Sequence, residues 1–558
     1  HWDAMAKIKM YEYPGGEGRG YNIDNVANSY IYKFDGNWDV PDSAKFQFGI
    51  PVDYLIGLFD SCTFLSLGAG GGSEVLQALQ EGAAEIHAVE VNGHINKMMT
   101  EGDRTGYLSE IIFSSDSIKG DSIEYRNPDS AILLPEFTGN IYHDPRVKVI
   151  TEDARTYVRR FKNKFDIIYS LSSNTWAALS SGSFALAENY LFTTEAFKDY
   201  WTALSDSGFM MMEHQLYMPR LVAELIEAFK ELGIKDYKNH LAVYDLPQMR
   251  RNALLLSKRP LDDSLRYHAL IDLVPEYYSY IHLLYPPADD SIAGNLVNRV
   301  VAEGWKSASD STPLNISPCT DNRPFTAQLG LWKNFDPNKH SYITRYGMDG
   351  FPLTQTIIII ILVIVFILIL PLNLIPYFKK GEKLKLIPFA YFFIIGIAYM
   401  AIEVVLIQKY TFFVGPSVYA ISTIIISLLI GSGIGSRFSG KFSDRVAFLG
   451  IIVWLILDSY LFNNVINGIN NVSLSGRMLI TTVLMFPLGF FMGMPFPKGA
   501  LRIKELIDWG FSVNGAASVI GSTAIVLVSI SYGFRSALLI GLGLYILAYF
   551  LITIKRAW

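Results

Sequence analysis

The chain contains 558 residues, of which 51% are hydrophobic and 18% are charged, and its mean hydropathy of +0.26 is high for a soluble protein. The net charge of −5 gives no reason to expect a nucleic-acid partner. Cys62 and Cys319 cannot build a disulfide framework or a thiolate metal site, and the nine histidines lack ligand spacing, so we expect no metal. The two cysteines could form one bridge, but two free, buried thiols are the simpler expectation.

The first 56 residues predict a small β-rich module. Short alternating segments at 7–13, 29–34 and 45–49 are separated by glycine-rich and Asn/Asp turns. His1 is not an initiator, and no signal-peptide pattern precedes Trp2. We therefore expect the chain to begin inside a longer protein, so that an N-terminal membrane half is missing here.

Residues 63–90 predict a strand, a glycine-rich loop, a helix and a second strand. The loop contains Gly68, Gly70 and Gly72, and Glu90 ends the second strand. Glycines let the backbone approach a ligand, and an acid at the end of the next strand can accept hydrogen bonds from ribose hydroxyls. The alternative is a tight turn in an α/β fold that binds no ligand.

The rest of the segment 57–260 continues an α/β pattern. A third strand at 147–150 leads to Asp153, and a fourth at 165–169 leads to a serine-rich stretch that includes Ser172. The expected elements that follow are a helix at 193–205, a strand at 208–213, a helix at 221–232 and β-like stretches near 238–256. The pattern predicts a doubly wound α/β (Rossmann-type) domain.

Residues 261–350 predict a helical cap or linker. Helical patterning covers 270–280, with a break at Pro275, and 292–302. The polar turn at 321–325 is expected to cap the domain or to dock it on the membrane region, with Arg323 supplying a fork of donors.

The remainder, 351–558, predicts an all-α, polytopic transmembrane bundle. Residues 357–370 form an unbroken apolar run of 14 residues, and with its flanks this run is long enough to cross a bilayer. We expect about seven spans, near 355–376, 387–408, 416–436, 446–465, 477–496, 512–532 and 535–553. The chain is therefore predicted to be an integral, multi-pass protein of the lipid bilayer.

The Lys and Arg residues between these spans predict an orientation. One set of alternate loops holds Lys379, Lys380, Lys383, Lys385, Arg437, Lys441, Arg445, Lys498, Arg502, Lys504, Lys555 and Arg556. The other set holds Lys409, Arg477 and Arg535. Because cytoplasmic loops carry the excess of positive charge, we expect a cytoplasmic C-terminus and, with seven spans, an extracytoplasmic soluble domain.

Four polar side chains are expected at membrane depth: Glu403, Gln408, Asp458 and Asn514. An acid in this environment is either functional or paired, and the alternative to function is that Glu403 pairs with Gln408 or Asn514 and locks helices together. The glycine pairs 431/435 and 489/493 have the small-xxx-small spacing of closely packed membrane helices.

Several segments resemble spermidine synthases and their class I methyltransferase-fold relatives. These are "FLSLGAGGGSEVLQALQEGAAEIHAVEVN", "DPRVKVITEDARTYVRRFKNKFDIIYS" and "ENYLFTTEAFKDYWTALSDSGF". "PCTDNRPF", "AIEVVLIQKYTFFVGPSVYAIS", "MPFPKGA" and "VNGAASVIGS" resemble the membrane-fused spermidine-synthase-like proteins, so the resemblance covers nearly the whole chain.

The resemblance implies an adenosyl ligand, either S-adenosylmethionine or its decarboxylated form. It implies that Gly68, Gly70 and Gly72 lie at the amino-acid and ribose end, that Glu90 binds the ribose and that Asp153 binds the adenine. Ser172 lies beside this pocket. An extracytoplasmic domain conflicts with this ligand, which is a cytosolic metabolite.

The chain departs from aminopropyltransferases after the fourth strand. They carry Asp-Ser-Ser-Asp there, with the first Asp as the base, whereas this chain has Leu171 and Asn174 at the acidic positions. A leucine cannot accept a proton, so spermidine synthesis is not expected. Glu188 is the obvious acid nearby. It is either a replacement base or a carboxylate that complements a helix dipole.

Three functions fit the sequence. The first is an adenosyl-dependent transferase that acts on a lipophilic or membrane-bound acceptor. The second is a structural or regulatory subunit of a membrane-protein complex, whose transferase fold has lost its chemistry. The third is a transporter with Glu403, Asp458 and Asn514 along its path.

Overall fold

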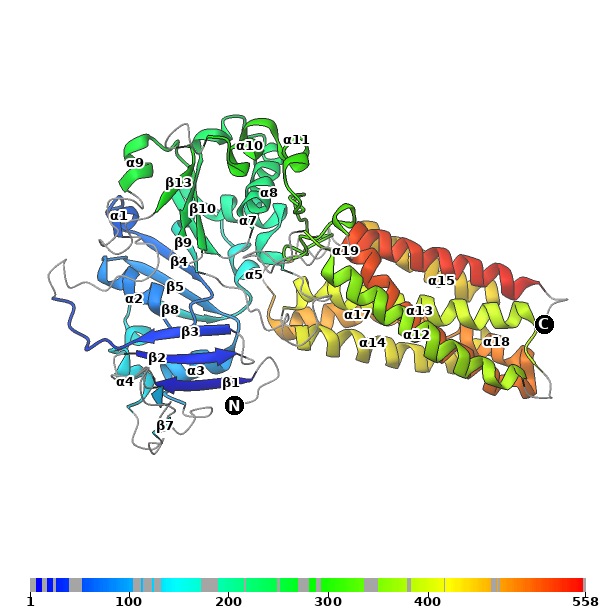
Figure 1. Ribbon diagram of the computed structural model, residues 1–558. Helices are drawn as coiled ribbons and strands as arrows, with labels where there is room; N and C mark the ends of the chain where they lie inside the picture. Colours follow the sequence, from blue (N-terminus) through cyan, green and yellow to red (C-terminus); the bar gives the residue numbers. More distant parts are fainter. Residues whose placement is uncertain are drawn as a thin grey trace. The chain divides into compact units, whose positions relative to one another are not determined.

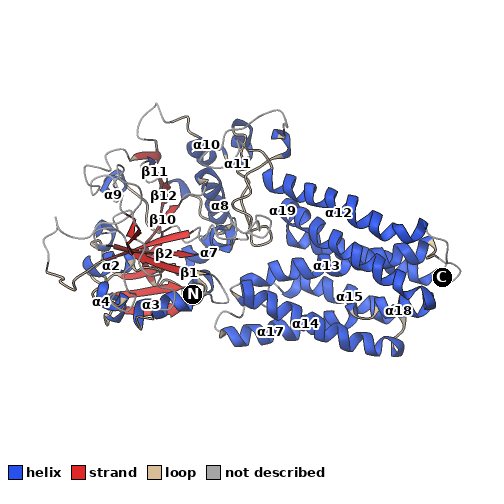
Figure 2. Cartoon of the chain, turned by 60° about the horizontal axis from the view of Figure 1, so that its bottom comes forward, coloured by secondary structure: helices blue, strands red, loops and turns tan. Residues whose placement is uncertain are grey.

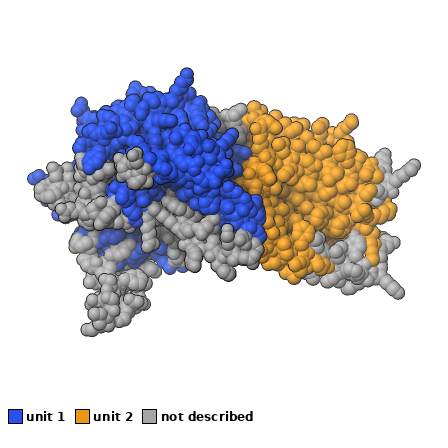
Figure 3. All heavy atoms as spheres, turned by 45° about the horizontal axis from the view of Figure 1, so that its top comes forward, with its two compact units in different colours: residues 1–351 blue, residues 352–558 orange. Residues whose placement is uncertain are grey.

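The computed structural model describes residues 7–12, 18–23, 27–39, 53–103, 112–113, 123–124, 132–171, 189–214, 217–247, 251–268, 281–287, 293–335, 350–378, 383–415, 417–462, 469, 472–554 and 558. The chain divides into two compact units, His1–Phe351 and Pro352–Trp558, which Figure 3 colours separately. We refer to them as unit 1 and unit 2.

Unit 1 begins with a three-stranded antiparallel sheet. The strands β1 (Ile8–Glu12), β2 (Gly18–Ile23) and β3 (Ala27–Tyr32) pair in sequence order. The β-rich N-terminal module is therefore confirmed, while the strand expected at 45–49 lies outside the described residues. Buried side chains of this sheet, including Tyr21 and Ile31, join the core of unit 1.

The main sheet of unit 1 has eight strands in the order β13-β11-β12-β10-β9-β4-β5-β8 (Figure 1). They are β4 (Thr63–Leu67), β5 (Glu85–Glu90), β8 (Val147–Thr151), β9 (Phe165–Leu171), β10 (Leu204–His214), β11 (Leu241–Leu246), β12 (Arg251–Ser257) and β13 (His282–Tyr285). The five strands from β10 to β8 are parallel, and β12 runs antiparallel to both β10 and β11. The chain order reverses between β4 and β9, which is where doubly wound sheets bind ligands at their carboxyl ends.

Helices cover both faces of this sheet, which confirms the doubly wound α/β fold. The helices of unit 1 are α1 (Asp53–Ile56), α2 (Ser73–Gln80), α3 (Gly93–Thr100), α4 (Leu134–Phe137), α5 (Ala154–Val158), α7 (Thr194–Ala203), α8 (Met218–Glu231), α9 (Asp263–His268), α10 (Leu296–Glu303) and α11 (Trp305–Ala308). Short 3₁₀ turns occur at η3 (Ile141–His143), η5 (Tyr190–Phe192), η6 (Tyr237–Asn239), η9 (Ser309–Ser311) and η10 (Trp332–Asn334), and β6 (Ile112–Phe113) pairs with β7 (Ile123–Glu124).

The two faces of the main sheet have separate cores. Buried residues of α2, α3, α4 and the N-terminal sheet pack on one face, and those of α5, α7, α8 and α10 pack on the other. Strand β4 contributes side chains to both cores, with Phe64 on the first face and Leu65 and Leu67 on the second. A strand buried on both sides needs apolar residues on both of its faces, as in parallel sheets generally.

The main sheet also extends into the region expected to be a cap or linker. Its edge strand β13 comes from beyond residue 260 and pairs with β11. The helix expected from residue 292 is α10, which begins at Leu296, and the helix expected at 270–280 lies outside the described residues. Cys62 and Cys319 are free and buried, as expected.

Unit 2 is helical (Figure 2). It contains α12 (Leu353–Phe378), α13 (Leu386–Val414), α14 (Ser417–Phe438), η11 (Ser439–Lys441), α15 (Asp444–Leu457), α17 (Leu474–Met492), α18 (Pro495–Ile503), η13 (Lys504–Leu506) and α19 (Ile507–Thr553). The π-helical segment η12 (Asp458–Phe462) continues α15.

Among the described residues, four stretches are long and apolar enough to cross a membrane: Leu386–Val414, Val418–Lys441, Asp444–Phe462 and Leu474–Thr553. A shorter apolar helix covers Leu353–Leu368. Unit 2 therefore has the composition of a membrane bundle. The number of seven crossings is finer than this finding and stays a prediction.

Helix α19 is divided at Gly533, whose φ of 83° and ψ of 170° are not helical. A straight helix of 47 residues would be about 70 Å long, more than twice the thickness of the hydrocarbon layer. The break therefore separates two arms of α19, each with the length of one membrane crossing.

The two glycine pairs pack α14 against α17. A Cβ on Gly431 would lie 2.7 Å from the Phe486 carbonyl O, and one on Gly435 would overlap the carbonyl O of Phe490. On the partner helix, Gly489 meets the backbone of Leu428 and Gly493 that of Ser432. The expected packing role of these glycines is confirmed, because side chains there would force the two backbones apart.

Candidate functional site

The glycine-rich loop lies at the carboxyl end of β4. Gly68, Gly70 and Gly72 have φ angles of 90°, 45° and 80°, which favour glycine over residues with a Cβ atom. The Gly68 and Ala69 N–H groups both donate to the Val89 carbonyl O at 2.9 Å. These bonds hold the loop against the end of β5.

Glu90 ends β5 and binds this loop. Its Oε2 accepts a hydrogen bond from the Gly70 N–H at 3.2 Å, and its Oε1 accepts one from the Asn92 N–H at 2.8 Å. The side chain is buried, and burial raises its pKa. The structure therefore brings together the loop and the acid that the sequence singled out as one site.

Tyrosines of unit 1 cover part of the loop. Tyr142 of η3 donates to the Gly70 carbonyl O at 3.0 Å and to the Ala69 carbonyl O at 3.3 Å. A Cβ on Gly70 would clash with the Tyr21 hydroxyl, and one on Gly71 would lie 2.7 Å from the Tyr30 carbonyl O. Residues of the N-terminal sheet and of η3 thus occupy the space on one side of the glycine-rich loop.

Asp153 follows β8, as expected, and caps α5. Its Oδ1 accepts a hydrogen bond from the Thr156 N–H at 2.8 Å. One oxygen of the carboxylate expected at the adenine thus serves the fold. Ser172 and Glu188, the other two expected site residues, lie outside the described residues, and Leu171 is the last residue of β9.

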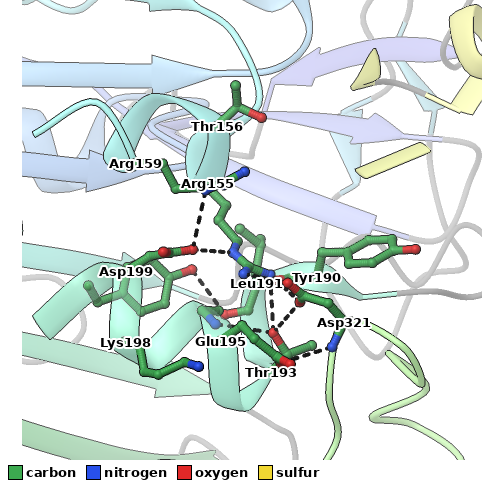
Figure 4. Close-up of polar contacts among 12 residues, drawn as sticks. Arg155, Thr156, Arg159, Tyr190, Leu191, Thr193, Glu195, Lys198, Asp199 and Asp321 are labelled. Atoms are coloured by element: carbon green, nitrogen blue, oxygen red, sulfur yellow. Dashed lines mark hydrogen bonds and ion pairs between the residues drawn. The ribbon is translucent and has the colours of Figure 1, made fainter. Parts of the chain in front are cut away.

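Arg155 is a central residue that the sequence reading missed (Figure 4). Its side chain is 2% exposed and donates to both carboxylate oxygens of Asp321, at 2.6 and 2.8 Å. Its Nε donates to Asp199 at 2.8 Å, and its Nη1 donates to the Tyr190 carbonyl O at 2.8 Å and to the Thr193 hydroxyl at 3.1 Å. The signal was a basic residue two positions after the acid Asp153, in a stretch that must pack on the sheet.

The contacts of Asp321 fix the segment 318–325. The Asp321 N–H donates to Glu195 Oε2 at 2.9 Å, and burial together with the Asp321 charge raises the pKa of Glu195 to about 7. The Asn189 N–H donates to the Pro324 carbonyl O at 2.7 Å. These contacts hold the segment against the rest of unit 1, and the choice between its two expected roles, capping and docking, stays a prediction.

The side chain that anchors this segment differs from the expected one. Arg323 donates to Ser317 and Pro318 within its own segment, at 2.9 and 3.2 Å. Asp321 reaches across to Arg155 instead, because the guanidinium of that buried arginine requires carboxylate partners.

In unit 2, Asp458 is fully buried and paired. Its Oδ2 accepts a hydrogen bond from Lys409 Nζ at 2.7 Å, and its Oδ1 accepts one from the Tyr410 hydroxyl at 2.7 Å. Lys409 also donates to the Asp458 carbonyl O at 2.8 Å. The pair joins α13 to η12.

The other expected membrane-depth residues behave differently. Asn514 donates to the Phe392 carbonyl O at 3.1 Å and joins α19 to α13, and Gln408 is buried on α13. Glu403 is half-buried on α13, and its expected pairing with Gln408 or Asn514 stays a prediction. The Asn514 amide reaches the Phe392 carbonyl O because the close approach of α13 and α19 at Gly396 brings the two backbones together.

The three cations assigned to the loops of one side also need correction. Lys409, Arg477 and Arg535 lie inside α13, α17 and α19. Arg477 donates to the Phe413 carbonyl O at 3.4 Å, and the Arg535 guanidinium lies 3.9 Å from the ring centre of Tyr460. These charges bind groups of unit 2, so they are not free loop charges.

Comparisons with known proteins gave structural matches alone. No protein-family model matches the chain, and no curated protein matches it. A spermidine synthase in complex with the transition-state analogue AdoDATO is 15% identical, with a TM-score of 0.29, covering 50% of this chain and 85% of its own.

Two further matches are of the same kind. A probable spermidine synthase from Corynebacterium glutamicum is 14% identical, with a TM-score of 0.28, covering 46% of this chain and 78% of its own. Spermidine synthase from Thermotoga maritima is 14% identical, with a TM-score of 0.25, covering 50% of this chain and 95% of its own.

Proposed function

We propose that unit 1 binds an adenosyl nucleotide, S-adenosylmethionine or its decarboxylated form, and transfers a group from it to an acceptor held in the membrane. The supporting observation is the hydrogen bond between the Gly70 N–H and Glu90. This bond joins a loop whose glycines have positive φ angles to an acid at the point where the strand order reverses.

The residues present fit such a ligand. The Glu90 carboxylate accepts backbone N–H groups of Gly70, Asn92 and Val91, and because a carboxylate has about four acceptor positions, one remains for a ribose hydroxyl. Helix α2 begins at Ser73, and its N-cap residue Gly72 supplies no side-chain cap, so the first N–H groups of the helix can face a ligand. The nucleotide would supply the electrophilic carbon, and the chain would orient it.

Chemistry of the spermidine-synthase kind is not proposed. Leu171 ends β9 and packs against the apolar core, so it can neither take a proton nor hold a cationic amine. Transfer to an acceptor that needs no strong base can proceed on proximity and orientation. The apolar helices of unit 2 would hold the chain at the bilayer that contains the acceptor.

Calorimetric titration of the full chain in detergent with the two nucleotides tests this proposal. We expect micromolar binding of at least one nucleotide. Glu90→Gln should weaken it about tenfold, because a hydrogen bond to a charged group contributes about 1.5–3 kcal/mol. Glu101→Gln, an exposed change at the end of α3, should leave the affinity as it is.

The second candidate is a structural or regulatory subunit of a membrane complex. It is favoured by the use of Glu90 and Asp153 as internal anchors, on the glycine loop and on α5. If neither nucleotide produced heat with the folded chain, this candidate would replace the first.

A further inference from the structure

Three buried carboxyl groups lie at the carboxyl ends of the central strands. Glu74 in the first turn of α2 is 6% exposed, Glu90 on β5 is 8% exposed and Glu213 on β10 is fully buried. They come from three separate elements around the glycine-rich loop.

The strand register places these groups on one face of the main sheet. Ser66 pairs in parallel with Ala88 and with Tyr169, and Tyr169 pairs with Met211. Paired residues of neighbouring strands point to the same face, and side chains two residues further along point the same way. Glu90 and Glu213 therefore share the face of Ser66, whose hydroxyl donates to Glu74 Oε1 at 3.4 Å.

Negative charge exceeds its compensation around Glu74. Glu213 forms an ion pair with Arg251, at 2.9 Å, and Glu90 accepts the backbone N–H groups of Gly70, Asn92 and Val91. Hydrogen bonds from the Ser66 hydroxyl and from its own backbone N–H favour the ionised form of Glu74. The negative charges of Glu90 and Glu213 disfavour that form. A buried carboxylate in such surroundings either binds a proton or needs a cation.

We propose that Glu74 and Glu213 receive the positively charged group of the bound ligand, so that the site selects a cationic adenosyl compound over a neutral one. This inference rests on the proposed nucleotide binding. Since the acids share one sheet face with Glu90, a ligand whose ribose lies on Glu90 would extend its charged end over them.

The charge of Glu74 controls this preference. Burial raises its pKa to about 8. The groups that face it are Glu90, Glu213 with Arg251, and the hydroxyls of Tyr21 and Tyr142, whose pKa values burial raises above their usual range. The tyrosines stay neutral, so raising the pH towards 8 ionises Glu74 and strengthens cation binding.

Titration of the full chain in detergent at pH 6.0 and 7.5 tests the inference with two probes. S-Adenosylmethionine carries positive charge, and 5′-methylthioadenosine is the neutral comparison. We expect S-adenosylmethionine to bind about twentyfold more tightly at pH 7.5 than at pH 6.0, because with a pKa of about 8 the ionised fraction of Glu74 rises by about that factor. 5′-Methylthioadenosine should bind equally at both.

Glu74→Gln mimics the protonated, neutral acid. It should therefore remove the pH dependence of S-adenosylmethionine binding and the preference for this ligand, while 5′-methylthioadenosine still binds. Ser66→Ala removes the hydroxyl that favours the ionised form, so it should move the pH dependence to higher pH. Exposed Glu101→Gln should behave like the parent chain.

Equal affinity of the parent chain for both probes at pH 7.5 would overturn the inference and leave nucleotide binding intact. The same holds if the preference survives in Glu74→Gln. Failure of both probes to bind would instead refute the proposed function itself.

Discussion

Arg155 connects parts of unit 1 that are far apart in the sequence. Asp321, its bidentate partner, lies 166 residues away in the sequence. Thr193 is the N-cap of α7, and Asp199 lies in the middle of that helix. A buried guanidinium is costly to desolvate, and here two carboxylates and a carbonyl oxygen compensate it. The same contacts fix Tyr190, which is two residues after Glu188, one of the expected site residues.

Removing one carboxylate of this group should destabilise unit 1. Asp321→Asn leaves part of the Arg155 charge unpaired, and we expect a loss of about 3 kcal/mol in the free energy of unfolding. Urea unfolding of the full chain in detergent, followed by tryptophan fluorescence, measures it. Glu227→Gln removes an exposed ion pair with Lys230 and should change the stability by less than about 1 kcal/mol.

An equal effect of the two substitutions would show that Arg155 does not depend on Asp321. In that case Asp199 would be the partner that keeps the guanidinium buried, because it contacts Nε from the other side.

At the scale of elements, α14 and α17 pack through backbone contact. Gly431 of α14 faces Phe486 of α17, and Gly435 faces Phe490. The contacts follow the same order along both helices, so the two helices run parallel. Such contact replaces the hydrophobic effect, which does not drive helices together inside a bilayer.

A methyl group at this contact should therefore weaken unit 2. Gly435→Ala places a Cβ onto the Phe490 carbonyl O, and we expect a loss of about 1–3 kcal/mol, seen as a lower melting temperature of the detergent-solubilised chain. Gly433→Ala in the same helix is the matched control, because nothing lies within 4 Å of its added Cβ. A melting temperature unchanged in both variants would mean that α14 and α17 can separate without cost.

At the scale of the whole molecule, the charges of unit 2 serve packing as well as orientation. Lys409 is paired with Asp458, and on the other set of charges Lys498 and Arg502 are paired with Asp444, at 3.3 and 2.5 Å. The positive-inside count therefore rests on fewer free loop residues than the sequence alone implies. The predicted orientation stays a prediction.

Cysteine labelling of intact cells tests that orientation. Lys383→Cys and Ser473→Cys introduce exposed thiols at the start of α13 and just before α17, and both native cysteines are buried. With a cytoplasmic C-terminus, a membrane-impermeant maleimide should label Cys at 473 and spare Cys at 383. The reverse pattern would place unit 1 in the cytoplasm, on the side where adenosyl nucleotides are made.

Local pattern determined much of the fold. The strand Thr63–Leu67 and the helix Ser73–Gln80 lie where apolar content and the glycine-rich turn predict them, and the apolar stretches of unit 2 follow from hydropathy. The neighbourhood of Gly70 and Glu90 was also predictable, because the ends of adjacent parallel strands meet at one edge of a sheet.

Partner choice was decided by the tertiary structure alone. Whether Asp153 faces a ligand or caps α5, whether Arg155 meets Asp321, and whether Lys409 lies in a loop or beside Asp458 depend on which groups burial brings together. Periodicity and composition describe each segment by itself. A buried charge is compensated by whichever opposite charge the packed chain places beside it, and that placement is a property of the whole fold.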